Sequence, residues 1–128
     1  IEMRSGTLTV NAGAIKSTAS TFDEKGNGSG TTMTGVAVAV SQHVTDKDLK
    51  VVINGGTLTG PYALYEKDLQ NETGNKALEI KDRIFEGQVY TKTSTAFIKG
   101  GTFSDVSALE SKERALIYLT DDAKLSLV

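Results

Sequence analysis

A short segment built around two glycines recurs along this chain and constrains its fold more than any other feature. The clearest copies are residues 53–60, Ile-Asn-Gly-Gly-Thr-Leu-Thr-Gly, and residues 98–105, Ile-Lys-Gly-Gly-Thr-Phe-Ser-Asp. Residues 80–87 form a degenerate copy, and residues 3–10 match as a fourth. Because so short a unit cannot bury its apolar side chains alone, each copy has to pack on the next. The repeat therefore predicts a stacked architecture.

Apolar and polar residues alternate inside each copy, as at Val51, Ile53 and Leu58. Alternation with period two predicts a strand, and the glycine pair indicates a bend or bulge between strands. A further apolar stretch follows each copy, for example Tyr62–Tyr65. Units made of such short strands coil into a solenoid whose successive turns pair in parallel and in register.

Two parts of the chain depart from the repeat. Residues 18–34 are polar and glycine-rich, which predicts a protruding loop inserted before the apolar stretch 36–40. Residues 114–128 alternate around Thr120–Asp122, which predicts either a hairpin or a final rung. An uncovered last edge pairs with other chains, so we expect some edge-to-edge self-association.

The length, charge and composition of the chain narrow the class of protein. A chain of 128 residues fits a single domain, and its start inside a repeat leads us to expect a domain taken from a longer protein. The net charge is -2 without a basic stripe, so nucleic acid is not an expected partner. The sequence contains no run of 18 apolar residues, so insertion into a membrane is not expected. The chain has no Cys, which excludes disulfides, thiolate metal sites and cysteine nucleophiles.

The Gly-Gly-Thr phrases at residues 52–60 and 97–105 resemble the rungs of right-handed parallel β-helix domains of the pectin-lyase-like kind. The resemblance covers about residues 1–10 and 35–109. It implies an all-β fold, a short right-handed parallel β-helix of about four rungs with one inserted loop, and a place in bacterial secreted or cell-surface proteins. That superfamily includes polysaccharide lyases, hydrolases, adhesins and stalks, so the resemblance selects no activity. The calcium-binding Asp clusters and basic catalytic residue of the lyases have no counterpart that can be placed on this sequence.

Three tyrosines, Tyr62, Tyr65 and Tyr90, occupy near-equivalent places on neighbouring units. If all three pointed outwards, they would form a platform on which a sugar ring stacks. If one or two pointed inwards, they would fill the core instead. The absence of Trp, which offers the largest stacking face, favours the second interpretation.

Acidic residues follow two successive apolar stretches, at Asp46, Asp48, Glu66 and Asp68. On one flank of a solenoid they would supply several of the six to eight oxygens that Ca²⁺ requires. Solvated turn carboxylates are the simpler interpretation, because the spacing lacks the alternating ligands of an EF-hand loop. The single histidine, His43, has no recognisable acid partner or oxyanion hole for acyl transfer, so no catalytic set is predicted.

The sequence thus predicts a non-catalytic extracellular module of a bacterial surface protein that binds a glycan or a host surface protein. A purely structural spacer is the first alternative, and a fragment of a polysaccharide lyase or hydrolase is the second. No cofactor is expected, except that calcium remains open.

Overall fold

The computed structural model describes residues 1–27, 30–41, 47–66, 76–81, 84–91, 98–105 and 119–127. These residues form strands and no helix, as the alternation predicted, and accordingly include no helix that could cross a membrane. The strands are β1 (Glu2–Met3), β2 (Gly6–Val10), β3 (Ala14–Lys16), β4 (Asp23–Asn27), β5 (Gly30–Thr34), β6 (Val36–Val40), β7 (Leu49–Ile53), β8 (Thr57–Glu66), β9 (Lys76–Ile80), β10 (Ile84–Thr91), β11 (Ile98–Asp105) and β12 (Leu119–Leu127).

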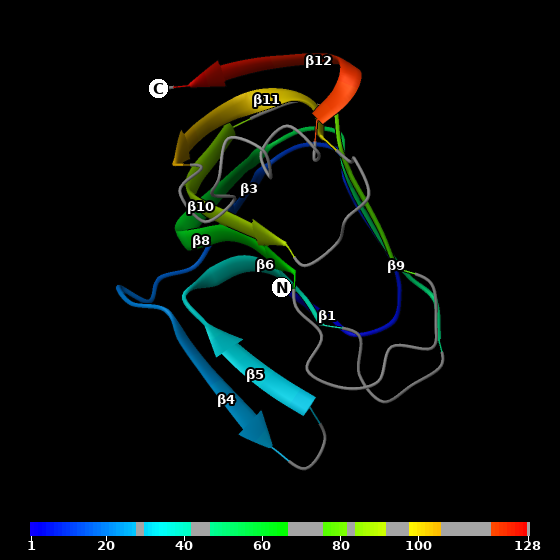
Figure 1. The fold of residues 1–128 in the computed structure, drawn as a ribbon. Helices are drawn as coiled ribbons and strands as arrows, with labels where there is room; N and C mark the ends of the chain where they lie inside the picture. The colour runs from blue at the N-terminus through cyan, green and yellow to red at the C-terminus, as the bar shows by residue number, and fades with distance from the viewer. Residues whose placement is uncertain are drawn as a thin grey trace.

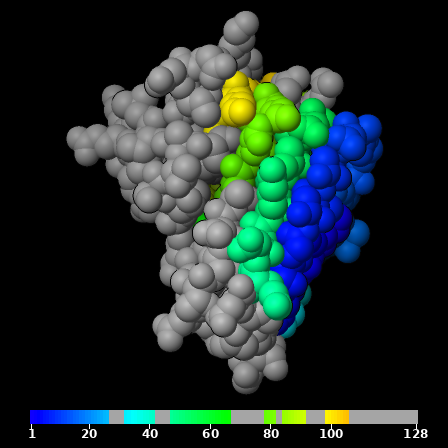
Figure 2. All heavy atoms as spheres, turned by 90° about the vertical axis from the view of Figure 1, so that its right-hand side faces the viewer, coloured from blue at the N-terminus to red at the C-terminus, as the bar shows by residue number. Residues whose placement is uncertain are grey.

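One large sheet of ten strands dominates the molecule, and it curls until it is nearly closed (Figure 1). Its order is β1-β6-β8-β10-β11-β9-β7-β2, with β3 paired to β8 and β12 paired to β11. Every pairing in this sheet is parallel. Viewed from the side, β2 (blue), β7, β9 and β11 (yellow) lie next to one another in this order (Figure 2).

The three best copies of the repeat pair with one another in the predicted register. Ile53 lies opposite Ile80, and Ile80 lies opposite Ile98. The residues that follow the glycine corner are aligned in the same way: Leu58, Phe85 and Phe103. The sequence interpretation of residues 53–60, 80–87 and 98–105 is therefore confirmed.

The fourth copy lies elsewhere than the sequence suggested. Met3 was expected to match Ile53, but Ile53 pairs with Val10, and Met3 pairs with β6. Because β3 pairs with the first residues of β8, the true counterpart of residues 53–59 is residues 10–16, Val-Asn-Ala-Gly-Ala-Ile-Lys. This segment keeps only one glycine of the pair, and for that reason the comparison of glycine patterns missed it.

The insertion predicted as a loop at residues 18–34 is instead a β-hairpin. β4 and β5 pair antiparallel, from Asp23 opposite Thr34 to Asn27 opposite Gly30, and the hairpin projects from the sheet (Figure 1). The sequence carries a matching signal, since the two residues between the paired Asn27 and Gly30 are Gly-Ser, a dipeptide typical of two-residue hairpin turns. The polar composition hid this signal.

The expectation of a hairpin near the C-terminus is also wrong. Residues 119–127 form one strand, β12, that pairs in parallel with β11, so Thr120–Asp122 is not a turn between two strands. The register shifts between Ile98 and Gly100, whose partners on β12 are Leu119 and Lys124. The alternative expectation, a final layer on the sheet, agrees with this pairing. Residues 114–118 lie outside the described residues.

The interior of the curled sheet is filled by aligned apolar columns. Phe85 and Phe103, which are 0% and 1% exposed, stack with ring centroids 4.8 Å apart and planes 7° apart. Leu58 continues the same column and is 0% exposed. Parallel pairing in register brings equivalent side chains together, and each such fully buried side chain contributes about 1.5–3 kcal/mol. These columns are the main source of stability.

The corner before each second strand depends on glycine at two aligned positions, Gly13 and Gly56. Their φ angles are 91° and 93°, a region that other residues rarely adopt. The backbones come close there, because Thr57 donates its N–H to the carbonyl oxygen of Gly13 over 2.9 Å. The sequence prediction of a glycine corner therefore holds in this part of the chain.

Candidate functional site

The three tyrosines that the sequence singled out do come together, joined by Phe22. Tyr62 and Tyr65 lie on β8 and Tyr90 lies on β10. The ring of Tyr65 stacks on Tyr90 with centroids 4.6 Å apart, and it lies 5.0 Å from Tyr62 and 4.8 Å from Phe22. We call these four residues the aromatic cluster. Its rings prefer these offset and edge-to-face arrangements, which strengthen their packing.

The aromatic cluster packs against the base of the hairpin, outside the main core. Tyr65 is 6% exposed and is buried with Met33 of β5 and with Val36 and Ala39 of β6. Its hydroxyl donates a hydrogen bond of 2.9 Å to Oε2 of Glu24 on β4. Tyr65 therefore fastens the hairpin to the sheet, and its ring has no open face on which a sugar could stack.

Tyr62 and Tyr90 remain half-buried at the margin of the aromatic cluster. Gln88 lies opposite Tyr62 in one strand pair and opposite Asp105 in the next. Burial raises the pKa of the Tyr62 phenol, and the neighbouring Tyr90 and Asp105 raise it further. Half-exposed aromatic edges next to an amide and a carboxylate supply both apolar contact and hydrogen-bonding groups, the combination that small-ligand sites use.

Substituting Tyr65 by Phe is expected to weaken the folded state in a pH-dependent way. Burial first, and then the hydrogen bond to Glu24, raise the pKa of the Tyr65 phenol above its ordinary value. The folded state therefore prefers the neutral phenol, and its contribution is complete below the unfolded pKa of about 10 and is lost as the pH rises above it. We expect Tyr65→Phe to cost about 1 kcal/mol at pH 7.

Urea denaturation of both proteins at neutral and strongly alkaline pH measures this effect. The difference in unfolding free energy should shrink at the alkaline pH, because only the wild type contains a phenol at residue 65 that resists ionisation. An equal difference at both pH values would contradict the burial of this hydroxyl.

The acidic candidates are placed less favourably for a common metal site. Glu66 is 1% exposed, and its Oε2 accepts a hydrogen bond of 2.8 Å from Thr91, itself 2% exposed. Asp48 is exposed and immediately precedes β7. Asp46 and Asp68 lie outside the described residues. Within the part of the chain that the structure describes, no group of three or more His, Cys, Asp or Glu could hold a metal ion, and calcium binding stays a prediction.

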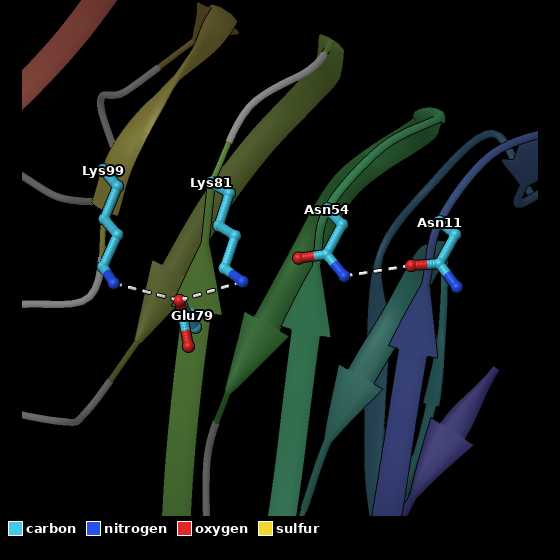
Figure 3. A network of polar contacts seen from close by, with 5 residues as sticks. All are labelled: Asn11, Asn54, Glu79, Lys81 and Lys99. Carbon is cyan, nitrogen blue, oxygen red and sulfur yellow. Dashed lines mark hydrogen bonds and ion pairs between the residues drawn. The ribbon is translucent and has the colours of Figure 1, made fainter.

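A row of polar side chains follows the corner of successive layers (Figure 3). Asn54 donates from Nδ2 to Oδ1 of Asn11 over 2.9 Å. Further along, Glu79 bridges two lysines, with its Oε1 3.0 Å from Lys99 Nζ and 3.6 Å from Lys81 Nζ. The hydrogen bond from Lys99 is the main cause that lowers the pKa of the Glu79 carboxyl. Such exposed pairs add little stability, but they offset the repulsion between stacked like charges.

Sequence reasoning missed the partners that give the aromatic cluster its shape. Phe22 and Met33 are the large apolar residues within or next to the two strands of the hairpin, and Glu24 lies between them in the chain. Two apolar residues in an otherwise polar insertion are a signal that it packs on something. The asparagine at residue 11, equivalent to Asn54, is likewise a signal for the displaced fourth copy.

Comparison of the chain with protein-family models, curated proteins and solved structures finds no match.

Proposed function

We propose that this chain is a right-handed parallel β-helix module of about four rungs that serves as a stiff, non-catalytic segment of a bacterial surface protein. The observation that carries the proposal is the common register of residues 10–16, 53–59, 80–86 and 98–104. A chain that returns to the same register at each layer contacts only neighbouring layers and extends as a rod. Parallel crossovers are right-handed in nearly all proteins, which supports the handedness.

The extracellular location rests on the Gly-Gly-Thr phrases, which resemble rungs of secreted and surface β-helix proteins. A stalk-like role agrees with the positions of the described side chains. The apolar ones fill the interior columns, and the aromatic cluster fastens the hairpin to the sheet. On this proposal the hairpin is the feature that the rod holds outwards, and it is the first place to look for a host-protein contact.

Glycan binding is the second candidate, and one observation favours it. Tyr62 and Tyr90 are half-buried beside Gln88 and Asp105, so a sugar would find aromatic edges and hydrogen-bonding groups on one surface. Without the ring of Tyr65, this surface offers less stacking area than the sequence suggested. A lyase or hydrolase fragment is the weakest candidate, since the calcium-binding Asp clusters and the basic catalytic residue of the lyases cannot be placed on the sequence.

Glycan-array binding followed by thermal unfolding with glycans and with Ca²⁺ separates these functions. For a stiff segment we expect no bound glycan and no shift of the unfolding midpoint. A ligand present at 100 times its Kd would stabilise the fold by about 2.7 kcal/mol, which is easily measured. Glycan-dependent stabilisation that Tyr90→Ala abolishes, and that the control Thr102→Ala keeps, would replace the stiff-segment proposal by the glycan-binding one. Turnover of pectin-type polymers would overturn both.

A further inference from the structure

The first strands of the chain form an open edge of the large sheet. Within the described residues, β1, β2 and β3 each pair with another strand on one side only. Figure 2 shows these blue strands at the margin of the stacked strands. An edge of this kind presents backbone N–H and C=O groups that are ready to pair with another parallel strand.

The apolar columns are incompletely covered at this edge. Leu8 and Ile15 pack against the core but are only partly buried. Their neighbours in the next layer, Val51 and Leu58, are 1% and 0% exposed. A further layer would bury the parts of Leu8 and Ile15 that are still exposed. Such burial is favourable in proportion to the apolar area removed from water.

Alternate residues of β2 point their backbone N–H and C=O groups away from β7, towards the open edge. Gly6 donates its N–H to Asp48 over 2.8 Å, and Val10 accepts from Asn54 over 2.8 Å, so these residues bond towards β7. In a parallel ladder, alternate residues bond to the same neighbour. The N–H and C=O of Thr9 therefore face the open edge, and the Thr9 side chain is exposed.

The opposite end of the sheet offers a matching edge. In the described residues β12 pairs only with β11, and it runs parallel to every other strand of the sheet. Its register follows both parts of β11. Leu119 lies opposite Ile98, the last of the aligned residues Val10, Ile53, Ile80 and Ile98. Leu127 lies opposite Phe103, the last of the aligned residues Ile15, Leu58, Phe85 and Phe103.

We propose that two copies of this chain associate head to tail, with β12 of one copy pairing in parallel with β2 and β3 of the next. The two edges agree in strand direction and register, so the second copy adds a layer that the sheet already repeats. The contact joins different surfaces, leaves one edge free on each copy and extends into linear assemblies. This inference goes beyond the proposed function, because it needs neither a ligand nor a surface location.

The test uses Thr9→Pro, which removes the outward N–H, with Thr9→Ala as the matched control that keeps it. Proline is tolerated on an edge strand when its nitrogen faces away from the ladder, so the variant should keep its circular dichroism spectrum. In sedimentation velocity from about 1 µM to about 1 mM, wild type and Thr9→Ala should at least double in average mass. Of the three proteins, each measured by itself, only Thr9→Pro should remain monomeric.

Mixing Thr9→Pro with the wild type distinguishes a head-to-tail contact from a symmetric contact between two N-terminal edges. Thr9→Pro keeps its β12 edge, so it should bind the wild type one to one and shorten the assemblies. Failure of the variant to bind the wild type would indicate a symmetric contact between two N-terminal edges and would overturn the proposal. A wild type that stays monomeric, or a Thr9→Pro protein that assembles as the wild type does, would also overturn it. If Thr9→Pro loses its fold, Thr7→Pro, on the same open side of β2, replaces it.

Discussion

Replacing Phe85 by Ala is expected to destabilise the fold by about 3–5 kcal/mol, as the loss of a large buried aromatic side chain generally does. Phe85 is 0% exposed and stacks on Phe103 with ring centroids 4.8 Å apart. Its column mate on the other side, Leu58, is also fully buried, so neither neighbour can move far to fill the cavity. Since single domains are stable by only about 5–15 kcal/mol, the variant would be close to unfolding.

The adjacent residue provides the control. Ile84 is 45% exposed and lies between Thr57 and Thr102 in the neighbouring strands. Ile84→Thr should change stability by no more than about 0.5 kcal/mol, as surface substitutions usually do. Urea denaturation with linear extrapolation measures both variants. Comparable losses at the two positions would mean that the strand does not present alternate faces to the core and to solvent.

The sequence was sufficient to predict the register of the sheet wherever both glycines of the repeat, or a clear alternation around them, were present. The layer at residues 10–16 escaped because Ala12 stands where the two clearest copies, residues 53–60 and 98–105, have glycine, and the comparison began from that glycine pair. The intervals between copies differ, so spacing alone could not locate it. A comparison of apolar positions, with Val10 and Ile15 matched to Ile53 and Leu58, would have found this layer.

The candidate site was less predictable, because its environment comes from a distant segment. The repeat predicted near-equivalent places for Tyr65 and Tyr90 on neighbouring units, and the two residues lie opposite each other on β8 and β10. The stacking of their rings is an additional finding. The burial of Tyr65 depends on the hairpin, which lies more than thirty residues earlier and carries Glu24. Glu66 illustrates a missed local signal. It has the same parity as the buried Leu64, so period two predicts that it faces inwards.

The second large effect is expected at the corner, where two glycines share a backbone conformation but differ in their surroundings. Gly13 and Gly56 have φ angles of 91° and 93°. A Cβ on Gly13 would meet no atom within 4 Å, whereas a Cβ on Gly56 would lie 2.6 Å from the carbonyl oxygen of Gly13. Gly13→Ala should therefore cost only the conformational strain of about 1–2 kcal/mol. Gly56→Ala should add a steric cost of about 1–3 kcal/mol, because the two layers have to separate.

Urea denaturation of the two variants, with Gly26→Ala as a baseline, isolates the two contributions. Gly26 lies in the hairpin, without a positive φ angle and with open space around it, so its substitution should be nearly neutral. The difference between Gly13→Ala and Gly56→Ala then reports the close approach of adjacent layers alone. If the two corner variants were equally destabilised, the two layers would not be in close contact at this corner.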